Sequence, residues 1–266
     1  KVHDINHEGK YFKVPGIHIS EPSPQRTPVI YQAGASPRGI AFAAENAEAV
    51  FVGAPTPEKL KATVTRIRDA AEAAGRDRHS VRIYTLLTII TAATAEEAEA
   101  KHQDYQRYTS DEGALALLSG WMGVDLSTYN LDEPLGAVKS NAIQSAAANF
   151  QKVNDDGEPW TVRDIAESAG IGGLGPRLVG SGAEVAEELI RWVQETDVDG
   201  FNLAYAVTPG TFEDVVEFVV PELQKRGAYP TEYAPGTLRQ KLFGAGDKLP
   251  EDHRGAKFRL APAVAG

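Results

Sequence analysis

Four short apolar runs, each followed by a helical pattern, constrain the fold of this chain more than any other feature. The runs are PVIYQAG (28–34), AVFVGA (49–54), RIYTLLTIITA (82–92) and GFNLAYA (200–206). Near-continuous apolar strands are typical of parallel strands that are buried on both faces, with helices as the crossovers. The repeat therefore predicts an α/β protein with a parallel sheet, either doubly wound or closed into a (β/α) barrel.

The glycine pattern favours the barrel. A dinucleotide-binding sheet carries GxGxxG between a strand and a helix, whereas the glycine-rich stretch GIGGLGPRLVG at 170–180 follows a helix. A complete barrel has eight strand–helix units, and only four are evident here. We therefore expect a TIM-type (β/α) barrel of which this chain supplies four units.

Capping signals predict where the helices begin. Thr56 precedes a proline suited to the first helical position, and Thr94 with Glu97 has the pattern of a capping box. Thr211 is expected to cap the helix after the fourth run. Pro221 lies inside that helix and should kink or split it, because proline lacks the N–H that a helix interior needs.

Residues 103–180 are expected to form a helical insertion without strands. Its helical segments are DEGALALLSGW, LGAVKSNAIQSAAANFQK and TVRDIAESAG, and GSGAEVAEELIRWVQET follows. An insertion after the third strand would lie at the carboxyl ends of the strands, where barrels place their active sites, as a lid or wall. Trp121, Tyr129 and Trp160 either line a pocket there or fill a small core of the insertion.

Composition excludes several classes of function. The 266 residues carry a formal net charge of −10, which argues against nucleic acid as a partner. The chain has no cysteine, and its six histidines show no metal-ligand spacing, so we expect no metal site. It contains no apolar stretch of membrane-spanning length and no signal pattern, which favours a cytoplasmic protein. Because Lys1 is not an initiator methionine, we expect a processed chain or a piece of a longer one.

The turn after the first run, GASPRG at 34–39, is the strongest candidate site. The amino terminus of a helix presents unpaired N–H groups and partial positive charge, so it binds phosphate where small residues leave the approach open. Ser36 can cap the helix and present its hydroxyl to an anion, and Arg38 adds a positive charge. The same residues also suit an ordinary helix start with a solvated arginine, and the local pattern alone leaves both interpretations open.

Several stretches together resemble one family. They are HEGKYFKVPG, SPQRTPVIYQAGASPRG, LLSGWMGVDLS, TDVDGFNLAYAVTPGTFEDVVEFVVPELQKRG and LRQKLFG. In this order they are similar to the carboxyl-terminal part of the bacterial-luciferase-like flavin monooxygenases. The branch is that of nitrilotriacetate monooxygenase component A, dibenzothiophene sulfone monooxygenase and long-chain alkane monooxygenase. The resemblance implies that residues 1–266 are the carboxyl-terminal half of a single barrel domain, with the last four of its eight strands.

The resemblance also implies a reaction and its cofactors. Reduced FMN, supplied by a separate flavin reductase, would react with molecular oxygen to give a flavin peroxide that oxygenates a small organic substrate. The family places the FMN phosphate against the turn after the first of these strands. Carried over to this sequence, the cofactor-binding residues are Ala35, Ser36, Pro37, Arg38 and Gly39.

The catalytic residues stay unassigned. The stretch aligned with histidine in some relatives holds Ala114, Leu115, Leu117 and Leu118, none of which can transfer a proton. The apolar insertion favours a neutral or sulfur-containing substrate. Four parallel strands leave two unpaired edges, so we expect either the missing amino-terminal half or a homo-oligomer. Two alternatives remain, a flavin or deazaflavin oxidoreductase of the same fold and a non-catalytic fragment that binds phosphate or a partner.

Overall fold

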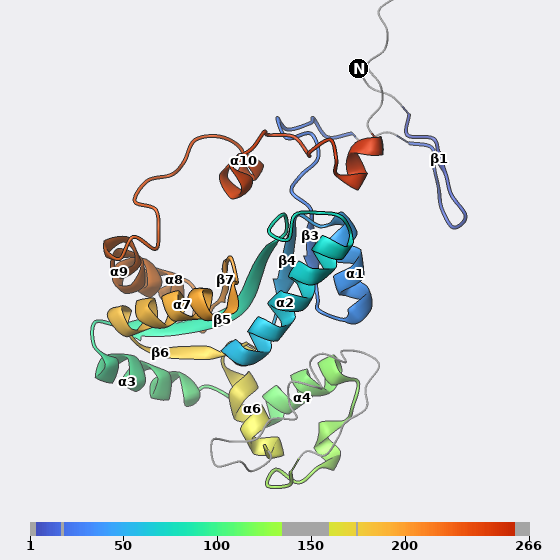
Figure 1. Ribbon diagram of the computed structural model, residues 1–266. Coiled ribbons are helices and arrows are strands. Elements are labelled where there is room, and N and C mark those ends of the chain that lie inside the picture. Colours follow the sequence, from blue (N-terminus) through green and yellow to red (C-terminus); the bar gives the residue numbers. More distant parts are fainter. Residues whose placement is uncertain (1–3, 17–18, 135–159, 174, 259–266) are drawn as a thin grey trace, which may run out of the picture. The chain divides into compact units, whose positions relative to one another are not determined.

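The computed structural model describes residues 4–16, 19–134, 160–173 and 175–258 (Figure 1). The chain divides into two compact units. One unit consists of Lys1–Val29 and Pro235–Gly266, and the other is Ile30–Ala234. The larger unit contains the sheet and every candidate site residue.

The sheet of the larger unit is parallel throughout. Strands β3 (Tyr31–Ala33), β4 (Ala49–Val52), β5 (Arg82–Ala92) and β7 (Gly200–Ala204) lie side by side in that order, which confirms the four predicted strands. Among the described residues the sheet does not close on itself, since β3 pairs only with β4 and β7 only with β5. The structure therefore shows an open parallel α/β sheet and no closed barrel.

A fifth strand contradicts the expectation of a strand-free insertion. Strand β6 (Arg177–Ser181) pairs in parallel with the second half of β5, from Thr88 to Ala92. Its sequence, RLVGS, is short and contains an arginine and a glycine, so it lacks the continuous apolar character of the other strands. The strand forms because the long strand β5 extends beyond the end of β4 and leaves backbone groups for β6 to pair with.

Helices α1 (Pro37–Asn46), α2 (Pro57–Ala73) and α7 (Gly182–Thr196) pack on one face of the sheet (Figure 1). The predicted caps are present, since Thr56 accepts a hydrogen bond from the Lys59 N–H and Thr94 forms the capping box of α3 (Ala95–Gln106). The core under these helices includes Ile40, Val50, Leu60, Ile67, Ile83 and Trp192. Because side chains alternate along a strand, Tyr84, Leu86 and Thr88 of β5 face the opposite side.

The helical segment after β7 is divided, as Pro221 predicts. It runs as α8 (Gly210–Asp214), the π-helical η2 (Val215–Val219) and α9 (Val220–Lys225). The expectation that Thr211 caps this segment is wrong. The segment begins at Gly210, and the Thr211 hydroxyl instead accepts hydrogen bonds from the N–H groups of Ala206 and Val207, at 3.1 and 3.0 Å.

The described part of the insertion forms a core of its own. Helix α4 (Asp111–Met122), the 3₁₀ turn η1 (Leu126–Thr128) and helix α6 (Val162–Gly170) surround it. Trp121, Tyr129 and Trp160 pack against this core, which supports the second of the two interpretations of these aromatic side chains. The predicted helix LGAVKSNAIQSAAANFQK lies outside the described residues.

The smaller unit contains residues from both terminal parts of the chain. It contains the hairpin of β1 (His7–Glu8) and β2 (Lys13–Val14), helix α10 (Leu238–Phe243) and the 3₁₀ helix η3 (Arg254–Phe258). The buried Arg239 guanidinium donates to the carbonyl oxygens of Thr27, Pro28 and Asp247. These bonds connect α10 to the segment that leads into β3.

Candidate functional site

The turn after β3 is a capped helix start, as the sequence predicts. Ser36 is the N-cap of α1, and its Oγ accepts a hydrogen bond from the Gly39 N–H at 3.1 Å. Pro37 occupies the first helical position, where no N–H is needed. The side chains of Ser36, Pro37 and Arg38 are exposed, whereas Ala35 and Gly39 are half-buried. Within the described residues, Arg38 has no ion-pair partner.

Two glycines shape this turn. Gly34 has φ +104°, a conformation that side chains disfavour, and its N–H donates to the Phe51 carbonyl at the end of the β3–β4 ladder. A Cβ on Gly39 would lie 3.1 Å from the Ser36 Oγ, so glycine leaves room for the capping hydroxyl. The turn thus offers the Arg38 N–H, the Ser36 hydroxyl and the Arg38 guanidinium to an anion at the open end of α1.

A hollow of about 320 Å³ lies on the face of the sheet opposite the helices, and aromatic side chains line it. Its lining includes Tyr31, Phe51, Tyr84 and Asn202. The rings of Tyr31 and Tyr84 stack with centroids 6.2 Å apart. Burial, and secondarily the nearby Tyr31 and Asp199, raise the pKa of Tyr84 to about 12. The Tyr84 phenol therefore stays protonated at neutral pH, where it can donate a hydrogen bond but cannot act as a base.

The insertion is seated on this same face of β5 through a tight turn. Gly172 and Gly173 both have left-handed φ, +76° and +72°, and a Cβ on Gly172 would lie 2.2 Å from the Thr88 Oγ1. A Cβ on Gly173 would lie 3.6 Å from the Trp121 ring of α4. The turn thus places the described part of the insertion against Thr88 of β5, and its role as a lid or wall of the site stays a prediction. Sequence reasoning noticed these glycines but gave them no role.

Arg177 secures the insertion to β6. Its guanidinium donates to the carbonyl oxygens of Glu167, Ser168 and Ile171, which end helix α6. Burial lowers the pKa of Arg177, because a charged group loses hydration there. These bonds to carbonyl oxygens compensate for part of that loss and fix α6 to the sheet.

A buried charge cluster lies at the other end of the strands, around Arg68. The Arg68 side chain is only 1% exposed, and it donates to Asp197 Oδ2 and Asp199 Oδ2 at 3.1 and 2.9 Å. Asp199 also accepts from the Arg82 guanidinium at 2.9 Å. Asp199 immediately precedes β7 and Arg82 begins β5, so the cluster stands at the amino ends of the strands, where barrels carry stability rather than catalysis. The sequence analysis missed it because its members are far apart along the chain.

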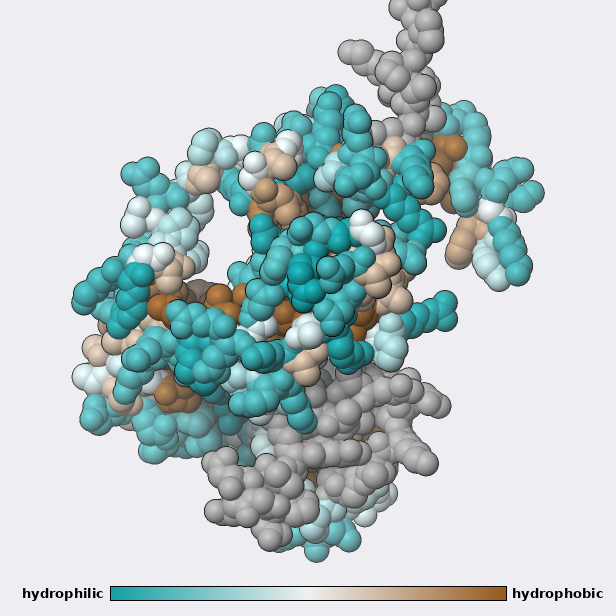
Figure 2. All heavy atoms as spheres, viewed as in Figure 1, coloured by the Kyte–Doolittle hydropathy of each residue, from teal (hydrophilic) through white to brown (hydrophobic). Residues whose placement is uncertain are grey.

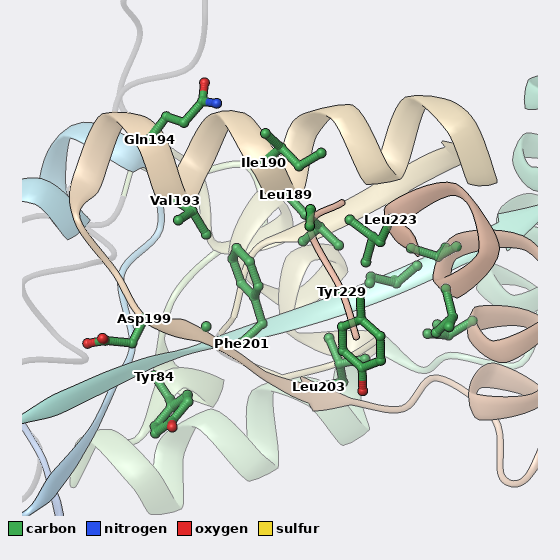
Figure 3. Close-up of a pocket in the computed structure, with 16 residues that line it drawn as sticks. Tyr84, Leu189, Ile190, Val193, Gln194, Asp199, Phe201, Leu203, Leu223 and Tyr229 are labelled. Atoms are coloured by element: carbon green, nitrogen blue, oxygen red, sulfur yellow. The ribbon is translucent and has the colours of Figure 1, made fainter. Parts of the chain in front are cut away.

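An apolar groove of about 570 Å³ lies between α7, β7 and α9 (Figure 3). Its lining includes Leu189, Val193, Phe201, Val219, Leu223 and Tyr229. In Figure 3 Leu189 and Val193 of α7 point toward Phe201, whereas Gln194 points away from it, and Leu223 and Tyr229 lie on the other side of the groove. Figure 2 shows apolar side chains in this region between the hydrophilic outer surfaces of the helices. The groove borders the aromatic hollow, because Tyr84 and Phe201 belong to the lining of both.

The described residues contain no group of three or more histidine or acidic residues placed to hold a metal ion. No helix in the part of the chain that the structure describes is long and apolar enough to cross a membrane.

Comparisons with known proteins point to one family. The family model described as luciferase-like monooxygenase matches residues 3–200. The chain is 52% identical over 262 residues to dimethyl-sulfide monooxygenase from Hyphomicrobium sulfonivorans, covering 98% of this chain and 54% of that protein. It is 45% identical over 260 residues to long-chain alkane monooxygenase from Geobacillus thermodenitrificans, covering 97% of this chain and 54% of that protein.

Solved structures agree with the sequence comparison. The crystal structure of DmoA from Hyphomicrobium sulfonivorans matches with a TM-score of 0.84 at 51% identity, covering 97% of this chain and 54% of that one. The structure of a riboflavin lyase with modified FMN and riboflavin also gives a TM-score of 0.84, at 34% identity, covering 97% of this chain and 57% of that one. The chain spans about half the length of these relatives.

Proposed function

Because this chain belongs to the luciferase-like monooxygenase family, we propose that it is part of a monooxygenase that uses FMN and molecular oxygen to oxygenate a small organic substrate. The observation that carries the proposal is the turn after β3, where a capped and exposed helix start offers hydrogen-bond donors to a phosphate. A relative of 34% identity has a structure that contains modified FMN.

The FMN phosphate would be held by the residues from Ala35 to Gly39. The Ser36 hydroxyl and the Arg38 N–H would donate to phosphate oxygens, and the Arg38 guanidinium would add charge complementarity. Gly39 keeps the approach to Ser36 open, since a Cβ there would crowd its Oγ. Bound reduced FMN would supply the electrons that activate oxygen, and the protein would supply binding, orientation and exclusion of water.

The substrate is proposed to be neutral or sulfur-containing. The aromatic hollow at Tyr31 and Tyr84 and the apolar core of the insertion offer no cation for a polycarboxylate in the described residues of these two surfaces. Relatives named for dimethyl sulfide and for long-chain alkanes are consistent with such a substrate. Because the pKa values of Tyr31 and Tyr84 are raised, neither phenol acts as a base at neutral pH, so a general base would come from elsewhere in the whole protein.

The whole protein is proposed to be a closed barrel of which this chain is the carboxyl-terminal half. The parallel sheet supplies five strands, β3, β4, β5, β6 and β7, of the eight that a barrel needs. The chain spans 54% of the length of dimethyl-sulfide monooxygenase, which leaves room for a comparable second half. By the family resemblance, a separate flavin reductase would supply the reduced FMN.

Calorimetric titration with FMN and with riboflavin, which lacks the phosphate, tests the phosphate site. Loss of a hydrogen bond to a charged group costs about 1.5–3 kcal/mol, so Ser36→Ala should weaken FMN binding roughly 10- to 100-fold and leave riboflavin binding unchanged. Arg38→Ala should act in the same direction.

Matched controls separate this effect from helix capping and from net charge. Ser110 caps α4 through the same contact, with its Oγ accepting from the Gly113 N–H at 3.1 Å, so Ser110→Ala removes an equivalent cap elsewhere. Arg66→Ala removes an exposed arginine from α2. Equal binding of FMN and riboflavin by the chain, both alone and joined to the rest of the barrel, would contradict the proposal.

A further inference from the structure

The side chain of Gln32 lies beside the first turn of α1. Tyr31 stacks on Tyr84 on the helix-free face of the sheet, and side chains alternate along a strand, so Gln32 points to the helix-covered face. Gln32 is half-buried, and its Nε2 donates to the Ala33 carbonyl oxygen at 2.8 Å. Its amide is thus held at the end of β3, next to the turn that is proposed to bind phosphate.

One N–H of this amide is left without a partner. A glutamine amide carries two N–H donors on its nitrogen and one acceptor oxygen. Because the Ala33 carbonyl oxygen can only accept, the nitrogen faces it, and this bond occupies one of the two N–H groups. Within the described residues the Gln32 side chain makes no other hydrogen bond. Its second N–H is therefore available to a ligand.

This donor borders the space beside Gly39, where no side chain stands. A Cβ at Gly39 would lie 3.1 Å from the Ser36 Oγ, 3.6 Å from the Gln32 Nε2 and 3.6 Å from the Gly34 carbonyl oxygen. The Ser36 Oγ accepts from the Gly39 N–H, which leaves the O–H of Ser36 free to donate. Two donors from different elements thus border one space that only a glycine leaves open.

Helix α4 begins in the same way but lacks this second donor. Ser110 caps it, and Gly113 stands three residues after the cap, as Gly39 does in α1. Among the described residues beyond its chain neighbours, only the Ser110 side chain lies within 4 Å of a Cβ at Gly113. A serine cap followed by glycine therefore does not require a nearby amide, and Gln32 is an additional feature of α1.

We propose that Gln32 is a further binding residue for the FMN phosphate, with its second N–H and the Ser36 hydroxyl donating to the same phosphate group. The Gly34 carbonyl oxygen would repel a phosphate oxygen, but it can accept from a hydroxyl of the ribityl chain to which that phosphate is joined. The ligand class is therefore a phosphate monoester with a neighbouring hydroxyl. The inference rests on the proposed function, because it adds a contact to the phosphate site proposed there.

Calorimetric titrations with FMN and with riboflavin test this contact, on the chain alone and joined to the rest of the barrel. Gln32→Leu removes the donor at similar side-chain size and should weaken FMN binding roughly tenfold or more, with riboflavin binding unchanged. Gln32→Glu places a carboxylate beside the phosphate and should weaken FMN binding further. The control is Gln224→Leu on α9, because half-buried Gln224 likewise donates through Nε2 to a carbonyl oxygen, that of Pro230 at 2.9 Å.

A second variant tests the space itself and leaves Gln32 in place. Gly39 lies in α1 and is not among the residues with positive φ, so alanine suits its backbone. The added methyl would stand between the Ser36 Oγ and the Gln32 Nε2, and Gly39→Ala should weaken FMN binding roughly tenfold or more relative to riboflavin. Gly113→Ala makes the same change at the start of α4 and should alter neither affinity.

The outcomes separate this inference from the proposed function, with circular dichroism to confirm that each variant folds. A purely structural bond from Gln32 to Ala33 predicts that Gln32→Leu weakens FMN and riboflavin binding equally. That result, or unchanged FMN binding in Gln32→Leu and Gly39→Ala, would overturn the inference. If Ser36→Ala still weakens FMN binding alone, the proposed phosphate site stands without Gln32; if Ser36→Ala has no such effect, the proposed site fails as well.

Discussion

Replacement of Gly172 by alanine should show how firmly the insertion is held against the sheet. Gly172 has φ +76°, and an added Cβ would lie 2.2 Å from the Thr88 Oγ1 and 2.8 Å from the Thr88 Cβ. Thr88 is fully buried, so its side chain has little space into which it can withdraw. The substitution therefore combines a disfavoured backbone conformation with overpacking against β5.

The two contributions can be measured separately. A left-handed conformation costs a residue with a Cβ about 1–2 kcal/mol, and overpacking of a core costs roughly a further 1–3 kcal/mol. Gly75 has φ +78° and open space around its Cβ position, so Gly75→Ala carries the backbone cost alone. Urea unfolding should therefore show a loss of about 2–5 kcal/mol for Gly172→Ala and about 1–2 kcal/mol for Gly75→Ala.

A double variant identifies Thr88 as the source of the difference. Thr88→Ala removes the Oγ1 and Cγ2 atoms that the new methyl would meet, and the Thr88 hydroxyl has no hydrogen-bond partner among the described residues. The double variant should be less destabilised than the two single variants predict, by about 1 kcal/mol. If Gly172→Ala loses no more stability than Gly75→Ala, the turn does not press on β5 and this account of the insertion is wrong.

Two further predictions concern charge and ionisation. Arg68→Met should lower the free energy of unfolding by about 3–5 kcal/mol in urea titrations, because it leaves the mostly buried Asp199 without one partner. The control is Arg66→Met, exposed on the same helix, which should change the free energy of unfolding by no more than roughly 0.5 kcal/mol. Similar losses for both variants would contradict the role of Arg68. Because the pKa of Tyr84 is raised to about 12, its contribution to stability should be complete below pH 10 and lost as pH rises toward that value. Tyr84→Phe should remove this part of the alkaline loss of the urea midpoint, and an unchanged profile would count against it.

Sequence reasoning succeeded where the physical cause is local. The caps at Ser36, Thr56 and Thr94 depend on a hydroxyl and an N–H three residues away, so their pattern is visible in the sequence. The division of the last long helix follows from a missing N–H at Pro221. The strand β5 was predicted from its uninterrupted run of apolar and β-branched residues.

It failed where distant residues decide the outcome. Strand β6 forms on backbone groups of β5 that lie almost ninety residues earlier, at Thr88 for Arg177. Thr211 is bound by N–H groups of the preceding loop, so its hydroxyl is engaged in a role that no capping rule describes. The helical pattern predicts that Arg68 is an exposed polar residue of an amphipathic helix. Its side chain is instead almost fully buried, because Asp197 and Asp199 compensate its charge.

The same distinction bears on the proposed site. The phosphate donors lie within one turn, from Ala35 to Gly39, and that turn belongs to a compact unit with its own core. The proposed substrate chemistry would need more than this turn, because the aromatic hollow beside Tyr84 lies on a sheet that has an unpaired edge at β7 among the described residues. Under the proposed function, phosphate recognition would therefore depend on contacts that this chain already makes, whereas oxygenation would also depend on the part of the barrel that this chain does not span. FMN binding and completion of the sheet are for this reason separable measurements, and each can fail without the other.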